Sequence, residues 1–170
     1  MSQSSALKVP KQRLEVELRL RGQEPRRVEI FVSDQHPGSR RRLDVLAALE
    51  QDEGFMPARD VDAGEWILVN KRALLWIALE QASEEGVVEV ELFDQRLPVQ
   101  AVFENGSKQE GELLFSPPAT GRRAVDHLNR EEPFFCLFCG ERVFIVNKTA
   151  LVALVEVQVS EPSGESRGED

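Results

Sequence analysis

Cysteine, histidine and long apolar runs are all scarce in this 170-residue chain, and each scarcity excludes a class of protein. With two cysteines and two histidines, the chain holds no disulfide framework, and a reducing cytoplasm is the expected location. No run approaches the roughly 20 apolar residues that a membrane-spanning helix needs, so we expect no membrane partner. The N-terminal segment also lacks the apolar stretch of a secretory signal, which agrees with a cytoplasmic location.

The charge balance is acidic. The chain has 30 Asp and Glu residues against 21 Lys and Arg residues, and a formal net charge of −9. Nucleic-acid binding depends mainly on Lys and Arg contacts to phosphate, so this balance disfavours a nucleic-acid partner without excluding a local basic patch. Hydrophobic residues make up 41% and charged residues 30% of the chain, which is typical of a globular protein of one ordinary domain or two very small ones.

Three sequence blocks occur twice in the same order. Ile67–Leu74 (ILVNKRAL) returns as Phe144–Leu151 (FIVNKTAL). The other pairs are Arg41–Leu46 with Arg123–Leu128, and Val28–Ser33 with Gly111–Ser116. Because three blocks seldom recur in order by chance, we predict a tandem duplication of one small unit.

The duplication suggests boundaries along the chain. We place repeat unit 1 at residues 13–80 and repeat unit 2 at residues 97–159, with 81–96 as a linker plus an extra strand at Val87–Phe93. Residues 1–12 and the acidic tail 160–170 have almost nothing to bury, so we expect both ends to be disordered.

Each unit is expected to be mostly β. Leu14–Leu20 alternates apolar and polar residues, as a half-buried strand does, and Asn105-Gly106 is a strong hairpin signal. The expected strands are 14–20, 28–32, 55–58, 66–70 and 74–79 in the first unit, and 99–103, 111–115, 134–138, 143–147 and 151–157 in the second. Apolar residues at helical spacing predict a helix over 41–50 capped by Ser39, and a shorter helical turn over 124–130. The predicted fold is therefore mainly β with short α insertions: two tandem small five-stranded barrel-like units packed as a pseudo-dimer.

The strand order and three segments of the second unit resemble a known family. These segments are Val99–Gly106, Gly111–Leu113 and Val143–Leu151, and they are similar to the Sm-like family, which includes the bacterial Hfq RNA chaperones. In that family an Asn-Gly turn joins the first two strands, a glycine bends the second, and a polar triplet after the fourth contacts RNA near the ring interface. The resemblance implies a small barrel and gives that RNA-contacting role to Asn147-Lys148-Thr149 and Asn70-Lys71-Arg72.

The chain departs from the family pattern in two places. Val28 stands where the first unit would have the bending glycine, and each unit inserts a helical segment where the family has a short turn. The Arg, Asp and Asn-Lys pattern also resembles small bacterial domains, a resemblance that implies no activity.

The candidate binding residues come from the repeated turns, the basic clusters and the tryptophans. They are Asn70, Lys71, Arg72, Asn147, Lys148, Arg41, Arg42, Arg123, Trp66 and Trp76. A structural interpretation stands beside the functional one: the asparagine caps a strand end while the lysine faces solvent, the arginines form a solvated face, and the tryptophans belong to the core. An interface anchor is the alternative for each tryptophan.

No residue pattern predicts an enzyme. Cys136 and Cys139 form a single Cys-x-x-Cys in an apolar run, whereas a zinc site normally needs two such pairs or histidines at defined spacing, so we expect structural thiols, no metal and no cofactor. Asp44 and Asp126 each follow an arginine by three residues. No second group recurs that could act with them as acid or base, so we expect an Arg–Asp pair or a cap.

The sequence favours a non-enzymatic, cytoplasmic adaptor or scaffold of bacterial type, which binds a protein partner through strand edges and the helical insertions. The alternative is an Sm-like RNA-binding protein that assembles as a ring of tandem units, with Asn70, Lys71, Asn147 and Lys148 lining the contact. A homo-oligomer is compatible with both hypotheses. A third hypothesis is a redox or metal protein that uses Cys136 and Cys139.

Overall fold

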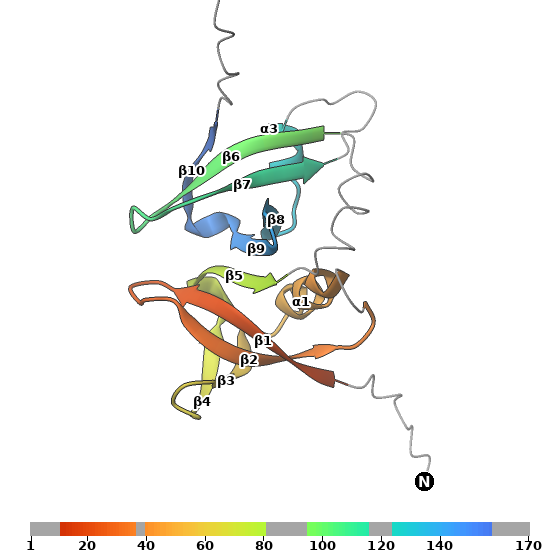
Figure 1. Cartoon of the computed structure of the whole chain (residues 1–170), viewed down its shortest axis with the longest axis vertical. Coiled ribbons are helices and arrows are strands. Elements are labelled where there is room, and N and C mark those ends of the chain that lie inside the picture. Colours follow the sequence, from red (N-terminus) through yellow and green to blue (C-terminus); the bar gives the residue numbers. More distant parts are fainter. Residues whose placement is uncertain (1–10, 37–39, 81–94, 116–123, 158–170) are drawn as a thin grey trace, which may run out of the picture.

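Two groups of strands, stacked along the long axis of the molecule, form the body of the protein (Figure 1). The structure is a computed structural model that describes residues 11–36, 40–80, 95–115 and 124–157. The fold is mainly β, as predicted, with two short α-helices. Among the described residues, no helix has the length and apolar character needed to cross a membrane.

The two halves have the same order of elements. The first half contains β1 (Lys11–Leu20), β2 (Arg26–Ser33), α1 (Arg41–Glu50), β3 (Phe55–Asp60), β4 (Trp66–Asn70), the 3-10 turn η2 (Lys71–Ala73) and β5 (Leu74–Glu80). The second half contains β6 (Gln95–Phe103), β7 (Lys108–Phe115), α3 (Ala124–Leu128), β8 (Phe134–Cys139), β9 (Arg142–Asn147), the 3-10 turn η3 (Lys148–Ala150) and β10 (Leu151–Glu156). The tandem duplication itself stays a prediction.

Two boundaries differ from the sequence prediction. Lys11 and Gln12 belong to β1, where we expected a disordered end, because they pair with Ser33 and Val32 of β2. Residues 95–96 belong to β6, where we expected a linker, because they pair with the end of β7. In both places, cross-strand pairing outweighs the polar local sequence. The predicted strand at 87–93, the predicted cap at position 39 and the predicted disordered tail lie outside the described residues.

The ten strands of the described residues form one antiparallel sheet, in the order β10-β6-β7-β8-β9-β5-β1-β2-β3-β4. The five strands of each half are neighbours, and the halves join where β5 pairs with β9, from Trp76 opposite Val146 to Glu80 opposite Arg142. Figure 1 shows these two strands facing each other between the halves. The outermost strands are therefore β4 at one end and β10 at the other. A pseudo-dimer of barrels stays a prediction.

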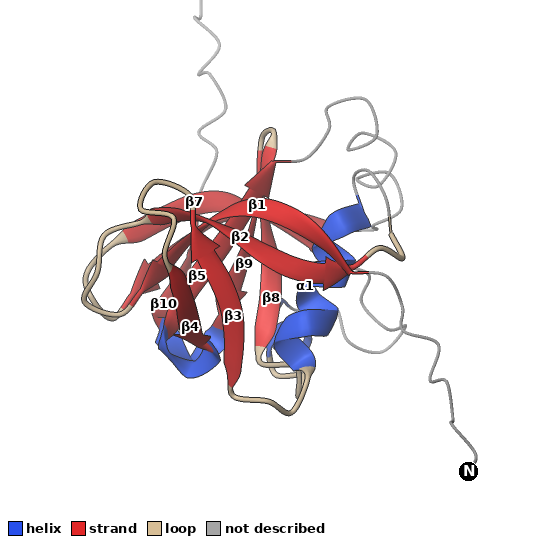
Figure 2. Cartoon of the chain, turned by 90° about the horizontal axis from the view of Figure 1, so that it is seen from below, coloured by secondary structure: helices blue, strands red, loops and turns tan. Residues whose placement is uncertain are grey.

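The helical insertion of the first half packs near the junction. α1 contacts β2 of its own half and β9 of the other half, and Figure 2 shows it against the side of the sheet. Val45 and Leu49, one turn apart on α1, are buried in the core of the first half. In the second half, α3 is shorter and contacts β7.

Gly111 marks a close approach within the second half. It lies in β7, where an added Cβ would come within 2.7 Å of Leu137 Cγ and 2.9 Å of the Phe138 carbonyl oxygen in β8. A side chain at this position would force two neighbouring strands apart.

We therefore expect Gly111→Ala to lower the free energy of unfolding by about 1–3 kcal/mol through overpacking. Urea denaturation of the purified protein measures this change. Gly54→Ala is the matched control, because no heavy atom lies within 4 Å of its added Cβ. Equal stability of the two variants would contradict the close approach of β7 to β8.

Candidate protein-binding interface

The junction of the halves shows how this sheet binds a strand, because each junction strand contributes side chains to the core of the other half. Trp76 and Ala78 of β5 are buried in the core of the second half. Val143 and Ile145 of β9 are buried in the core of the first half. Trp76 also meets the Phe144 ring edge-on, with 5.1 Å between ring centroids. Pairing therefore buries apolar side chains on both faces of the sheet, which stabilises it by roughly 25 cal/mol per Å² removed from water.

A buried amide adds a specific polar contact to the junction. Asn147 Nδ2 donates a hydrogen bond to the Leu74 carbonyl at 2.9 Å, and Asn147 is only 3% exposed. Its Oδ1 accepts a hydrogen bond from the Thr149 backbone N–H at 3.1 Å and so caps η3. At the surface, Arg142 pairs with Glu17 at 3.3 Å across the two halves. The junction is thus an apolar strand pair with one buried amide contact.

The outer strands are the counterparts of the two junction strands and lack such a cover. By position in the repeat, β4 corresponds to β9, and β10 corresponds to β5. Among the described residues, all but one of the exposed large apolar side chains lie on these strands or directly beside them. The set comprises Phe55, Trp66, Leu68, Val152, Val155 and Val157, and the exception is Val125 of α3. The two outer strands therefore form the candidate interface.

The contrast in exposure is largest on β4. Leu68 is 73% exposed, whereas its counterpart Ile145 in β9 is fully buried. Trp66 is 64% exposed and stacks on Phe31 with 5.5 Å between ring centroids, whereas its counterpart Val143 is buried. These side-chain positions are buried in β9, which has a neighbouring strand on both sides, and exposed in β4, which has a neighbouring strand on one side only.

The open edge of β4 also presents backbone hydrogen-bonding groups. Lys71 N–H bonds to the Gly54 carbonyl, and the Glu65 carbonyl accepts from Asp60 N–H, both on the β3 side. Because backbone groups alternate in direction along an antiparallel strand, Trp66 and Leu68 direct theirs away from β3. On β10, Val157 N–H bonds to the Pro98 carbonyl of β6. By the same alternation, the backbone groups of residues 154 and 156 point away from β6.

The repeated turns have mainly structural contacts. Asn70 Oδ1 accepts from the Arg72 backbone N–H, as the capping interpretation predicted. Lys71 is buried, and its Nζ donates to the Gln51 carbonyl at 3.2 Å. Lys148 Nζ donates to the Arg130 carbonyl at 3.1 Å. Each lysine therefore ties its turn to the segment after the helical insertion. The burial of Lys71 corrects the prediction that it faces solvent, whereas Lys148 is partly exposed.

The remaining candidate residues are dispersed. Trp76 is buried at the junction, and Trp66 is exposed on β4. Arg42 is also buried, with its guanidinium 5.3 Å from the centre of the Phe138 ring. Arg41 is half-buried on α1, and position 123 lies outside the described residues. Arg42 nevertheless lines the same cleft as Lys148 of the second repeated turn, together with Arg130. Sequence reasoning missed Leu68 and Val155, because their apolar runs are readable in the sequence but the position of these strands at the edges of the sheet is not.

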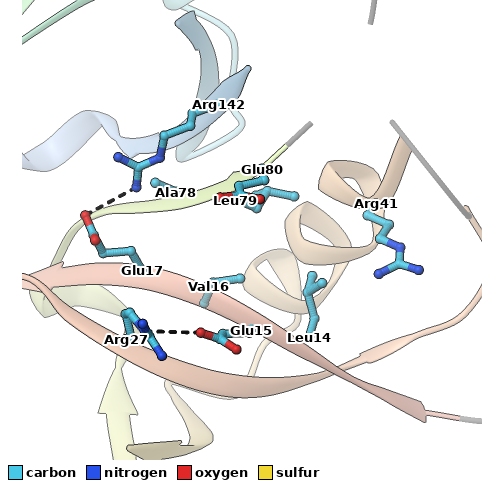
Figure 3. Close-up of a pocket in the computed structure, with 10 residues that line it drawn as sticks. All are labelled: Leu14, Glu15, Val16, Glu17, Arg27, Arg41, Ala78, Leu79, Glu80 and Arg142. Carbon is cyan, nitrogen blue, oxygen red and sulfur yellow. Dashed lines mark hydrogen bonds and ion pairs between the residues drawn. The ribbon is translucent and has the colours of Figure 1, made fainter. Parts of the chain in front are cut away.

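A charged hollow lies beside the junction (Figure 3). Its volume is about 570 Å³, and it is lined by Leu14, Glu15, Val16, Glu17, Arg27, Arg41, Ala78, Leu79, Glu80 and Arg142. Glu15 pairs with Arg27 at 3.1 Å and Glu17 with Arg142 at 3.3 Å. Because these charges neutralise one another within the hollow, they do not select a ligand of one sign.

A smaller cleft of about 240 Å³ lies between α1 and the second half. Phenylalanines of β8 line it together with basic groups that include His127, Arg130 and Lys148. Burial lowers the pKa of His127, and the nearby charges of Arg130 and Lys148 lower it further. Burial also lowers the pKa of Lys148. These shifts favour the neutral imidazole in the folded protein.

The cysteines and the repeated aspartates do not form a reactive cluster. Cys136 and Cys139 are not joined in a disulfide, and they pack against different cores. The described residues contain no group of three or more His, Cys, Asp or Glu side chains that could hold a metal ion. Asp44 is buried and accepts hydrogen bonds from the backbone N–H and Nδ1 of His36, so His36 is a partner of this carboxylate that we did not predict.

Comparison of the chain with protein-family models, curated proteins and solved structures gives no match.

The buried amide leads to a first prediction for the junction. Asn147→Ala removes the bond to Leu74 and the cap of η3, so we expect the free energy of unfolding to fall by about 1–3 kcal/mol. Asn105→Ala is the control, because Asn105 Oδ1 makes the same two contacts with Ser107 that Asn147 Oδ1 makes with Thr149, but at an exposed turn. Urea denaturation measures both variants. A loss no larger for Asn147→Ala than for Asn105→Ala would contradict the role of the amide in the junction.

The lowered pKa of His127 predicts a pH dependence of stability. Below about pH 6.5 the unfolded chain takes up the proton first. We therefore expect the stability of the wild type to fall between pH 7.5 and pH 5.5 relative to His127→Gln, which cannot titrate there. Thermal unfolding of both proteins across this range measures the difference. Parallel pH profiles would contradict the shift.

Proposed function

We propose that this protein is a non-enzymatic protein-binding module, an adaptor or scaffold, which recruits its partner by pairing a strand with an open edge of its sheet. The observation that carries this proposal is the concentration of exposed apolar side chains on β4 and β10. An unpaired strand offers backbone donors and acceptors to an incoming strand, while alternate side-chain positions give specificity.

The sequences of these edges support recognition. Natural proteins protect an open edge with charged residues, proline or a bulge turned toward solvent. β4 has the sequence WILVN and contains no charge and no proline. β10 has the sequence LVALVE, with a single charge at its end. β10 also has a bulge at Val152, but a protein that exposes two strands with so little charge is expected to use them for binding.

The same geometry suggests how binding gains free energy. A strand paired with β4 would form backbone hydrogen bonds, each contributing about 0.5–1.5 kcal/mol net. It would also cover Leu68 and Trp66, which are among the most exposed apolar side chains of the described residues. The internal β5–β9 pair is an example of this mode of binding within the molecule.

RNA binding through the repeated turns is the alternative function, and the described contacts give it less support. Asn147 is buried, and both Lys71 and Lys148 donate to backbone carbonyls. These bonds hold each ammonium group against the backbone of its own half. The net charge of −9 also opposes a polyanion.

A pull-down from native lysate, with and without nuclease, distinguishes the two functions. We compare tagged wild type with Leu68→Lys and Val155→Lys, each of which places a charge on one outer strand. The expected result is a protein partner that survives nuclease treatment and is lost with at least one edge variant. Val125→Lys is the control, because it replaces an exposed valine on α3, away from both edges. Partners retained by both edge variants, or lost with nuclease, would contradict the proposal.

A further inference from the structure

We infer that the charged hollow of Figure 3 is a binding site for a short peptide with free amino and carboxyl ends, a ligand that carries one positive and one negative charge. None of the described residues that line the hollow belongs to the outer strands β4 and β10. The inference therefore goes beyond the proposed edge recognition and does not depend on it. Its basis is a split in the sheet and two charged side chains beside that split.

The hollow lies where β1 and β5 separate. The pairing of these strands ends with Glu17 opposite Ala78, and the same register continued by one pleat would place Glu15 directly opposite Glu80. Like charges directly opposite each other destabilise an antiparallel pair. Beyond this point β1 pairs only with β2, and β5 pairs only with β9, where Glu80 lies opposite Arg142. Figure 3 shows the two strands diverging around the hollow.

The split turns backbone groups of β1 toward the hollow. Val61 N–H bonds to the Arg27 carbonyl on the β3 side, so the next residue, Val28, directs its backbone groups toward Val16 of β1. By the same alternation, the backbone N–H and C=O of Glu15 point toward β5, where the ladder has already ended. A peptide has backbone donors and acceptors that can pair with these groups.

Two of the charged side chains that line the hollow have no partner in it. The lining includes three arginines and three glutamates, of which two of each sign are joined in ion pairs. Within the described ranges, no ion pair or side-chain hydrogen bond involves Arg41 or Glu80, and Arg41 Nε is buried without a hydrogen-bond partner. Figure 3 shows Arg41 on α1 and Glu80 on β5, with no dashed line to either. A ligand with both charges gives each of them a partner.

The position of Arg41 favours the carboxyl end of the ligand for a second reason. Arg41 is the first residue of α1, and the N-cap residue of this helix makes no side-chain capping hydrogen bond. The N–H groups of a first helical turn and the positive end of the helix dipole both favour an anion. Helical side chains lean toward the N-terminus, so the guanidinium of Arg41 lies on that side. It can bind a carboxylate through two parallel hydrogen bonds.

The size and the remaining lining of the hollow define the middle of the ligand. The carboxylate of Glu80 accepts hydrogen bonds from the terminal ammonium group, and the uncharged part of the lining is apolar, comprising Leu14, Val16, Ala78 and Leu79. The volume of about 570 Å³ lies in the range of roughly 300–1,000 Å³ that is typical of small-molecule sites. A peptide of a few residues with small or apolar side chains therefore fits the site.

Calorimetric titration of the full chain with the tripeptide alanyl-leucyl-alanine tests the site, and backbone amide NMR spectra follow the same titration. Two derivatives each lack one charge: the N-acetylated peptide lacks the ammonium group, and the C-amidated peptide lacks the carboxylate. We expect saturable binding of the unmodified tripeptide. Each derivative should bind about tenfold more weakly, because a hydrogen bond to a charged group is lost.

Two substitutions assign the ends of the peptide to the two side chains. Arg41→Gln and Glu80→Gln should each weaken binding of the unmodified tripeptide about tenfold. Arg41→Gln should not weaken the amidated peptide further, and Glu80→Gln should not weaken the acetylated peptide further, because the contact is already absent. Lys108→Gln and Glu141→Gln are the matched controls, since they remove the same charges from exposed positions outside the hollow. Circular dichroism and urea denaturation verify that all four variants are folded.

Titrations that show neither saturable heat nor saturable NMR shifts with the unmodified tripeptide would overturn the inference. Equal affinity for the unmodified peptide and its two derivatives would overturn it too, and so would equal effects of Arg41→Gln and Lys108→Gln. Dependence on only one end of the peptide would also reject a ligand with two charges. None of these results bears on the edges β4 and β10, so the proposed function stands or falls by the lysate experiment alone.

Discussion

The pairing of β5 with β9 is the interaction on which the rest of the structure depends. It converts two groups of five strands into one sheet. It also exchanges side chains between the halves, because Ile145 completes the first core and Trp76 completes the second. Both strands are covered on both faces, so separating the halves would expose two cores at once. The position of α1, which contacts β9 as well as β2, follows from this junction.

The same pairing accounts for the surface of the molecule. The two halves are joined through the fifth strand of one and the fourth strand of the other, so β10 and β4 are left at the ends of the sheet. Isolated edge strands are normally protected against pairing with other chains. Here they carry Leu68, Trp66 and Val155 to the surface, where the corresponding junction residues are buried. The exposed apolar surface thus follows from the position of β4 and β10 at the ends of the sheet.

The repeated asparagines show how one residue type takes different roles at equivalent positions. Asn70 and Asn147 cap the same kind of turn with the same hydrogen bond. Only Asn147 is buried by a neighbouring strand, and only there does its amide bond across the junction. The lysines that follow them are held by the segments after the helical insertions. Repetition in sequence therefore preserved the turn, and the surroundings decided its further use.

Local sequence patterns determined the elements of this protein. Period-two alternation located the strands, helical spacing located α1, and Asn105-Gly106 located a hairpin turn, because these signals depend on residues within a few positions of one another. The pairing of Lys11 and Gln12 with β2 was not readable from their polar character. The placement of Trp76 at the junction and of Trp66 on an open edge was also not readable from the sequence. Those outcomes required the tertiary structure, because they depend on contacts between residues far apart in the chain, such as Trp76 with Val146, which no local pattern specifies.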